Sequence, residues 1–221
     1  MMSKGNIKPA GKVIKLIIAD DHQLIRSGIK YMLAETSDIA VVGEAANGTE
    51  AVSLARSIQW DVAILDVNMP IRTGIDALKI IHDEWPKKAI LILSMYPEEQ
   101  YAVRAIELGA SGYLTKGSIS NELIVAIRYV HKGRKYITPM VAERLAGAVG
   151  NKQKGKVESL SNRELQILML IASGRTLVQA AEALNLSVST VSEYRRRILQ
   201  KLGLENTNEL VRFGVERGLV D

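Results

Sequence analysis

Five polar residues in this chain of 221 residues directly follow, or closely follow, short apolar runs. They are Asp20, Asp21, Asp66, Ser94 and Lys116. Neighbouring carboxylates repel one another and raise one another's pKa, so a fold tends to avoid such a group unless a cation offsets the charge. Mg²⁺ favours a few carboxylates with water and phosphate oxygens, and a lysine can hold a phosphoryl oxygen. Since an aspartate can attack phosphorus, the set predicts a site that accepts a phosphoryl group.

Five repeats of a strand and a helix are predicted to position these residues. The strand-length apolar runs are VIKLII (13–18), IAVVGEA (39–45), DVAIL (61–65), AILIL (89–93) and SGYL (111–114). The helical segments, with apolar residues three and four apart, are 23–34, 48–57, 74–83, 98–108 and 119–131. This alternation predicts an α/β domain with a parallel sheet covered on both faces. Ligands bind such sheets at the carboxyl ends of the strands.

Each polar residue also has an ordinary local explanation. Asp66 lies in AILDVNMPIRTG (63–74), where Pro70 and Gly74 predict a loop and a helix start, so it could be a turn aspartate. An acidic pair or a serine after a strand is commonly a solvated turn, and a lysine is commonly on the surface. The local explanations do not account for the convergence of all five at one edge of the predicted sheet.

The composition excludes several kinds of site and suggests an anionic partner. The absence of cysteine excludes disulfides, thiolate zinc sites and thiol nucleophiles. No apolar run is long enough for a membrane span, and residues 1–12 lack the apolar centre of a signal peptide, so we expect a cytoplasmic protein without a membrane partner. Residues 151–221 carry 11 basic and 8 acidic side chains against 18 and 16 over 1–150, which makes the shorter part more basic per residue.

The strand pattern ends near residue 132, and a second, all-helical domain is predicted beyond a linker. GNKQKGK (150–156) contains glycine and lysine without apolar residues, as is typical of flexible linkers. The predicted parts are a disordered arm (1–12), the α/β domain (13–135), a linker with a short helix at 140–149 (136–157), and the helical domain (158–221).

Four helices are predicted in the second domain, at 161–172, 176–184, 188–202 and 207–217. Ser161 with Glu164 forms a capping-box pattern, and Gly203 follows the third helix as a stop. Two helices joined by a short turn, the second rich in arginine, indicate a helix-turn-helix.

The arginine run 195–197 has two explanations. A solvated basic helix face accounts for many such clusters. Alternatively, a recognition helix exposes short polar side chains to bases and cations to phosphates. The face opposite the apolar stripe carries Ser189, Ser192, Glu193, Arg196 and Gln200, which favours the recognition helix.

The motifs IADD, LDVNMP, LSMY and GASGYLTKG occur in this order, and through them residues 13–135 resemble the receiver domain of two-component response regulators. The resemblance implies a flavodoxin-like (βα)5 fold with strand order 2-1-3-4-5. It also implies Asp66 as the phospho-acceptor and Lys116 as a phosphoryl contact. The implied Mg²⁺ ligands are Asp20, Asp21, Asp66 and the backbone carbonyl of Asn68. Ser94 and Tyr113 match the family's switch pair.

The segments LSNRELQIL, AAEALNLSVSTV and ILQKLGLEN carry a second resemblance, to the LuxR-type helix-turn-helix domain, over residues 158–221. It implies base contacts from Ser189, Ser192, Glu193 and Arg196, and phosphate contacts from Thr190, Tyr194 and Arg197. Many members have lysine where Ser192 stands and histidine where Tyr194 stands, so the family's base preference does not transfer to this chain.

Together the two parts resemble a NarL/FixJ-type response regulator, a transcriptional regulator that depends on phosphorylation. The implied partners are a sensor histidine kinase that phosphorylates Asp66, promoter DNA with paired half-sites, and a second copy of the chain when active; RNA polymerase is a further candidate. Paired half-sites raise affinity through effective concentration. By the same resemblance, the helix at 207–217 is the candidate for dimerisation on DNA.

Two other functions fit parts of the pattern. A phosphatase with an aspartyl-phosphate intermediate would need a general acid two residues beyond Asp66, where this chain has Asn68, which cannot donate a proton as a carboxylic acid can. A regulator that acts without phosphorylation would not need the full set of strand-end residues. We therefore expect autocatalytic phosphorylation and dephosphorylation of the aspartate, and no conventional enzyme activity.

Overall fold

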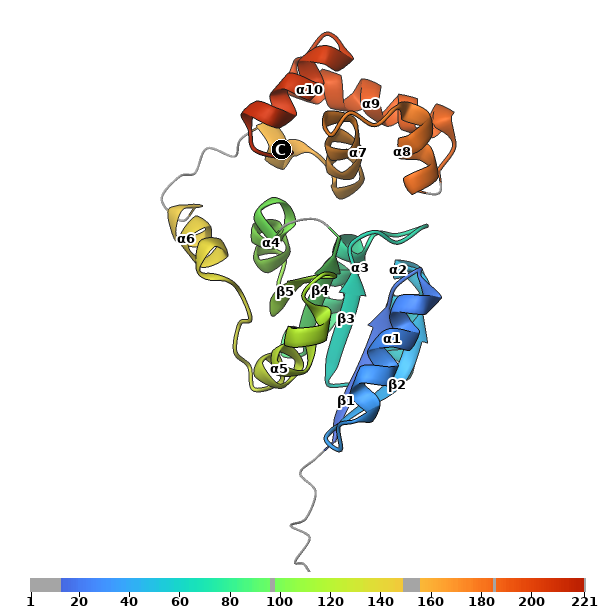
Figure 1. The fold of residues 1–221 in the computed structure, drawn as a ribbon, viewed down its shortest axis with the longest axis vertical. Helices are drawn as coiled ribbons and strands as arrows, with labels where there is room; N and C mark the ends of the chain where they lie inside the picture. The colour runs from blue at the N-terminus through green and yellow to red at the C-terminus, as the bar shows by residue number, and fades with distance from the viewer. Residues whose placement is uncertain (1–12, 96–97, 149–155, 185, 221) are drawn as a thin grey trace, which may run out of the picture. The chain divides into compact units, whose positions relative to one another are not determined.

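The computed structural model describes residues 13–95, 98–148, 156–184 and 186–220. The chain divides into two compact units, Met1–Thr138 and Pro139–Asp221 (Figure 1). The predicted arm 1–12 and most of the predicted linker GNKQKGK lie outside the described residues. In the part of the chain that is described, no helix combines the length and apolar character needed to cross a bilayer.

The first unit contains a five-stranded parallel sheet in the order β2-β1-β3-β4-β5. The strands are β1 (Ile14–Ala19), β2 (Ile39–Ala45), β3 (Val62–Asp66), β4 (Ala89–Ser94) and β5 (Gly112–Thr115). All residues of β3 and β4 are buried, as the uninterrupted apolar runs predicted for central strands. The predicted α/β fold class and strand order are confirmed.

Helices cover both faces of this sheet (Figure 1). They are α1 (Gln23–Ala34), α2 (Gly48–Ser57), α3 (Gly74–Glu84), α4 (Glu98–Glu107) and α5 (Ile119–His131). The buried faces of α1 and α5 share one core with alternate strand residues such as Leu16, Ile64 and Leu91. Because successive strand residues point to opposite faces, Ala63, Leu65, Ile92 and their neighbours face the other helices.

The register of the strands aligns their carboxyl ends. Ala19 pairs with Leu65, so the next residues, Asp20 and Asp66, are neighbours across β1 and β3. Ser94 pairs with Thr115 at the end of β4 and β5, which places Lys116 directly beyond that pair. The apolar strands therefore determine which polar residues meet at this edge.

The loop after β3 is closed by a close backbone approach at Gly74. The amide of Gly74 donates to the carbonyl of Val67 (3.1 Å), and Thr73 caps α3 by accepting a hydrogen bond from the amide of Asp76 (3.1 Å). A Cβ atom on Gly74 would lie 1.9 Å from the carbonyl oxygen of Asp66. The start of α3 thus packs directly against the backbone of Asp66.

The second unit is helical. It contains α6 (Pro139–Ala148), a short 3-10 helix (Lys156–Ser159), α7 (Asn162–Ala172), α8 (Leu177–Ala183), α9 (Val188–Leu202) and α10 (Thr207–Glu216). The predicted helices agree with these bounds within a residue or so at each end. The predicted capping box is present at Ser161 and Glu164, and Gly203 ends α9 in the left-handed conformation (φ 69°).

Helix α7 is the central helix of this unit. All its residues except Arg163 are buried, including Glu164 and Gln166. The Glu164 carboxylate pairs with Lys201 of α9 at 2.6 Å. Burial alone would raise the pKa of Glu164, but hydrogen bonds from Lys201 and Ser161 lower it below its ordinary value. This ion pair fixes α9 against α7.

The close approach at Gly74 predicts a large loss of stability for Gly74→Ala. Since the clash is with backbone, the first unit should lose about 3 kcal/mol of unfolding free energy, at the upper end of the range for overpacking. Trp60 and Trp85, the only tryptophans of the chain, both lie in this unit, so their fluorescence in a urea titration reports its unfolding alone.

The matched control is Gly28→Ala on the exposed side of α1, where an added Cβ meets no atom within 4 Å. This variant should gain about 0.5–1 kcal/mol, because alanine is the better helix former. Equal stability of the two variants would contradict the packing described for Gly74.

Candidate functional site

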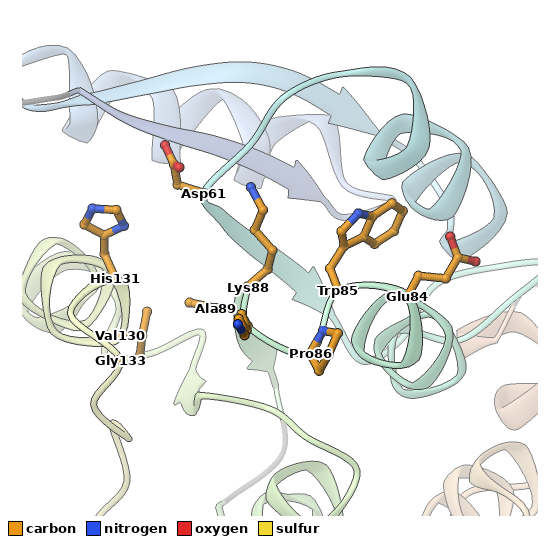
Figure 2. A pocket seen from close by; sticks show the side chains of 10 residues that line it. Asp61, Glu84, Trp85, Pro86, Lys88, Ala89, Val130, His131 and Gly133 are labelled. Atoms are coloured by element: carbon orange, nitrogen blue, oxygen red, sulfur yellow. The ribbon is translucent and has the colours of Figure 1, made fainter.

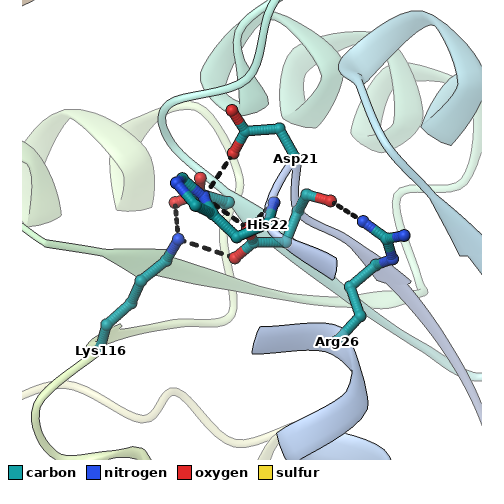
Figure 3. Close-up of polar contacts among 6 residues, drawn as sticks. Asp21, His22, Arg26 and Lys116 are labelled. Atoms are coloured by element: carbon teal, nitrogen blue, oxygen red, sulfur yellow. Dashed lines mark hydrogen bonds and ion pairs between the residues drawn. The ribbon is translucent and has the colours of Figure 1, made fainter. Parts of the chain in front are cut away.

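Three of the five predicted strand-end residues, Asp20, Asp66 and Lys116, are in direct contact at the carboxyl edge of the sheet, and Asp21 lies beside them. The ammonium nitrogen of Lys116 lies 2.7 Å from Oδ2 of Asp20 and 3.1 Å from Oδ1 of Asp66. Figure 3 shows this ammonium between two carboxylate oxygens, with Asp21 beside them. The Lys116 side chain is only 5% exposed, although its charge would ordinarily keep it in water. The site therefore holds a lysine between two buried carboxylates.

Asp66 is destabilised as an anion. It is the last residue of β3 and is 1% exposed. Burial raises the pKa of Asp66 to about 7; the Lys116 ammonium opposes this rise, and repulsion from Asp20 and Asp21 adds to it. Its Oδ2 atom is buried and has no hydrogen-bond partner among the described residues. An unsatisfied buried carboxylate oxygen is costly, and a cation or a covalent partner would satisfy it.

Lys116 remains charged in this setting. Burial by itself would lower the pKa of Lys116, but attraction to Asp66 and Asp20 outweighs burial and raises the pKa above its ordinary value. The ammonium offsets part of the negative charge without neutralising all three carboxylates. The three carboxylates at this edge of the sheet can therefore bind a further cation.

The acidic group has the composition of a metal site. One ligand atom from each of Asp20, Asp21, His22 and Asp66 lies within 4.8 Å of the others. Carboxylate oxygens suit hard divalent cations such as Mg²⁺. The buried Oδ2 atom of Asp66, without a hydrogen-bond partner in the described part of the chain, is the second feature that fits a cation here.

His22 belongs to this cluster and was not predicted from the sequence. Its amide donates to Oδ1 of Asp20 (2.8 Å), and its ring nitrogen Nδ1 lies 2.7 Å from Oδ1 of Asp21. Arg26 adds a guanidinium contact to the carbonyl oxygen of Asp20 (2.7 Å). Only the position of His22 in the sequence could have indicated this role, because it directly follows the acidic pair and precedes the first residue of α1.

The remaining predicted residues of the first unit lie on β4, on β5 and in the loop after β3. Asn68 is half-buried in the loop after Asp66. Ser94 and Tyr113 are both buried, and the amide of Lys116 donates to the carbonyl of Ser94 (2.7 Å). In the register, Ile92 pairs with Tyr113 and Ser94 with Thr115, so Ser94 and Tyr113 share one face of the sheet. Their exchange as a switch stays a prediction.

A cavity of about 520 Å³ lies at the other end of the sheet and is separate from this cluster (Figure 2). Asp61 precedes β3, Ala89 begins β4, and His131 ends α5, so the cavity lies beside the amino ends of the strands. Lys88 on its wall already donates to the carbonyl oxygen of Trp60 and lies 5.1 Å from that indole ring. The cavity contributes no residue to the acidic cluster.

The second unit places all seven predicted DNA contacts on α9, outside its buried stripe. The stripe consists of Val191, Ile198 and Leu202. The predicted contacts are Ser189, Thr190, Ser192, Glu193, Tyr194, Arg196 and Arg197, and each is half-buried or exposed. Ser189, Thr190, Glu193, Tyr194 and Arg197 line one shallow hollow of about 340 Å³.

The three consecutive arginines of α9 have different neighbours. Arg195 points to α10, where its Nη1 donates to Oγ1 of Thr207 (3.2 Å). Arg196 donates to Glu193 through Nε (3.1 Å) and Nη2 (2.7 Å). Arg197 donates to the same carboxylate through Nε (3.2 Å) and lies 5.8 Å from the ring of Tyr194. Only Arg196 and Arg197 are available on the exposed face.

Two family models match the chain. The response regulator receiver domain matches residues 16–128, and the luxR family of bacterial regulatory proteins matches residues 158–213. The acidic cluster lies within the first match and α9 within the second.

Two response regulators are similar to this chain along nearly their whole length. The response regulator GacA of Pseudomonas aeruginosa is 36% identical over 211 residues, which cover 95% of this chain and 99% of the relative. The response regulator UvrY of Escherichia coli K12 is 35% identical over 209 residues, covering 94% and 96%.

Solved structures of the regulator RcsB from Salmonella typhimurium are similar to this chain over most of its length. One, described by its conformational dynamism for DNA interaction, is 27% identical with a TM-score of 0.62 and covers 92% of this chain and 97% of that one. Another, RcsB bound to promoter rprA in the presence of the phosphomimetic BeF3⁻, is 25% identical with a TM-score of 0.59 and covers 91% and 98%. The chain belongs to the NarL/FixJ family of response regulators, transcription regulators that join a receiver domain to a LuxR-type DNA-binding domain.

Proposed function

We propose that a sensor histidine kinase phosphorylates Asp66 with Mg²⁺ present, and that the phosphoryl group alters the pairing of chains and so controls promoter binding. The observation that carries this proposal is Asp66 itself. It is buried at a strand end with Lys116 on one oxygen and no hydrogen-bond partner on the other among the described residues. A carboxylate placed in this way fits a covalent acceptor better than a structural group.

The transfer uses the chain's own residues as follows. A carboxylate oxygen of Asp66 attacks phosphorus, and the P–N bond to the kinase histidine breaks, with its electron pair leaving on nitrogen. Lys116 holds a phosphoryl oxygen with its ammonium, which already lies between Asp66 and Asp20. Asp20 keeps Lys116 in place during the reaction. The developing negative charge thus meets a cation that is fixed before the reaction begins.

Asp20, Asp21 and Asp66, with the carbonyl of Asn68, would hold the metal. When bound, Mg²⁺ supplies positive charge that neutralises these carboxylates and the phosphoryl oxygens. His22 contacts both Asp20 and Asp21 and so limits the orientations of their carboxylates. The acidic group itself, with its unsatisfied buried oxygen, supports the assignment.

The output is DNA binding through α9, by a dimer on paired half-sites. The RcsB structures named above include one bound to a promoter in the presence of a phosphomimetic, and another structure shows two RcsB dimers bound to two DNAs. After phosphorylation, the Ser94 hydroxyl donates a hydrogen bond to the phosphoryl group. The side chain of Tyr113, on the same face of the sheet, then changes its position. RNA polymerase is a further proposed partner of the DNA-bound dimer.

Phosphorylation can be tested with acetyl phosphate or a kinase and Mg²⁺. The wild type should gain one phosphoryl group by intact mass, whereas Asp66→Asn should gain none, because the amide is not a nucleophile for phosphorus. The control Asp83→Asn removes an exposed carboxylate of α3 and should label like the wild type. Equal labelling of Asp66→Asn and the wild type would contradict the acceptor assignment.

The metal can be tested by stability. Tryptophan fluorescence in urea should show that Mg²⁺ at a hundred times its Kd stabilises the wild-type receiver unit by about 2.7 kcal/mol. Asp66→Asn should respond much less, since it removes a carboxylate ligand. Asp83→Asn should respond like the wild type.

The metal-free proteins should differ as well. Burial raises the pKa of Asp66 from 3.8 to about 7 in the fold. Ionisation of Asp66 therefore destabilises the fold progressively as the pH rises from 3.8 to about 7, and the full loss of stability is reached above this range. In EDTA at pH 8, Asp66→Asn should therefore be more stable than the wild type by about 2–4 kcal/mol. Lower stability of this variant in EDTA would contradict the charge repulsion described.

DNA binding can be tested at two arginines. Arg196→Ala should weaken specific binding by about 1–3 kcal/mol if its side chain contacts a base. Arg197→Ala should lower the slope of log K against log salt by about 0.9, with little change in sequence preference, if it contacts a phosphate. Arg56→Ala removes the same charge from the receiver surface, and should change neither quantity. An unchanged slope in Arg197→Ala would exclude the phosphate contact.

A further inference from the structure

We infer that Glu193 determines DNA sequence specificity by positioning Arg196 for guanine, and that it acts through this arginine and not by a base contact of its own. The inference rests on the proposed DNA-binding function and concerns the same face of α9. It changes the role that the family resemblance implied for Glu193.

One carboxylate holds two guanidinium groups on this face. Oε2 and Oε1 of Glu193 accept from Nε and Nη2 of Arg196, and Oε1 also accepts from Nε of Arg197. The hydrogen bonds from Arg196, followed by those from Arg197, lower the pKa of Glu193 to about 2, so the carboxylate is ionised under all physiological conditions. The group is in solvent, with side chains 44% exposed for Glu193 and 64% for Arg196.

Because Glu193 occupies one edge of the Arg196 guanidinium, the other edge is the one that can contact a base. A guanidinium has a side edge, formed by Nε and Nη2, and an end edge, formed by Nη1 and Nη2. Glu193 binds the side edge of Arg196. Among the described residues, no hydrogen bond is assigned to Nη1 of Arg196. The end edge, whose two parallel donors match O6 and N7 of guanine, is therefore the one presented outward.

The same carboxylate limits binding that ignores sequence. Arg196 and Arg197 together carry two positive charges, and Glu193 reduces the charge of the three residues to one. Attraction to phosphates depends on charge and carries no sequence information, whereas a bidentate contact to guanine depends on geometry. Glu193 therefore weakens non-specific binding to phosphates and, by fixing the guanidinium of Arg196, favours the specific contact with guanine.

This role does not depend on the stability of the fold. Exposed ion pairs on a helix contribute little to stability, so the cluster is not needed to hold α9 in place. The buried stripe and the Glu164–Lys201 pair do that. Substitutions at Glu193 should thus leave the domain folded, which allows a change in specificity to be measured without loss of structure.

The experiment selects bound sequences from a random double-stranded DNA library with the full-length chain, treated with acetyl phosphate and Mg²⁺. The proteins are the wild type, Glu193→Gln, Arg196→Ala and the double variant. The matched control is Glu84→Gln, because Nε of Arg56 donates one hydrogen bond shared between both carboxylate oxygens of Glu84, and Nη2 of Arg56 contacts the same carboxylate, on the receiver unit. Binding to the selected site and to an unrelated duplex is then measured against salt.

We expect Glu193→Gln to enrich the same motif with the preference for guanine at one position reduced about fivefold or more, within the range of a bidentate contact. Its slope of log K against log salt on unrelated DNA should be larger by about 0.9, because one more cation is available to phosphates. Arg196→Ala should lose the same guanine preference, and adding Glu193→Gln to it should cause no further loss. Glu84→Gln should match the wild type.

Three results would overturn the inference. An unchanged motif and slope in Glu193→Gln would show that the ion pairs have no part in recognition. Loss of a cytosine preference, with guanine retained, would show that Glu193 contacts a base directly. Failure of the wild type to enrich any motif would overturn the proposed DNA-binding function as well, which distinguishes it from the first two results.

Discussion

The chemistry of the first unit depends on the balance between burial and charge at Asp66. Parallel pairing aligns the carboxyl ends of β1, β3, β4 and β5, and this brings Asp20 and Asp66 side by side with Lys116 between them. The core fixes the backbone, so the carboxylates cannot separate to relieve their repulsion. A buried charge with an incomplete set of partners costs stability, and the cost is retained where the group has a chemical role. The phosphoryl group and the metal ion proposed for this site would both reduce this cost.

The same region connects the site to the rest of the receiver through backbone contacts. Gly74 begins α3 against the carbonyl of Asp66, and the amide of Lys116 binds the carbonyl of Ser94. A change in charge on Asp66 therefore acts on groups that are already packed against the ends of β3, β4 and β5. Packed elements respond to such a change by moving between discrete arrangements, which is the behaviour required of a switch.

The sequence was sufficient for the elements and for most of the acidic cluster, because both follow from short-range patterns. Uninterrupted apolar runs marked the central strands, and the capping box marked the start of α7 at Ser161. Contacts between side chains were harder to predict from the sequence than the elements. The contact of His22 with Asp21 depends on a rotamer at the helix start, and the burial of almost all of α7 depends on three neighbouring helices. The sharing of the Glu193 carboxylate by two arginines could likewise not be predicted, since an arginine run gives no indication of which guanidinium edge is occupied.

A carboxylate controls a cation in both units, and burial determines what each arrangement can do. In the receiver, Asp20 and Asp66 hold Lys116 in a site that excludes water, so attraction is strong and any added negative charge has a large effect. On α9, Glu193 holds Arg196 in solvent, where the same attraction is weak and screened by salt. A weak pair orients a side chain without preventing its contact with DNA. The buried cluster is thus suited to receive a chemical signal, and the exposed cluster to discriminate among DNA sequences.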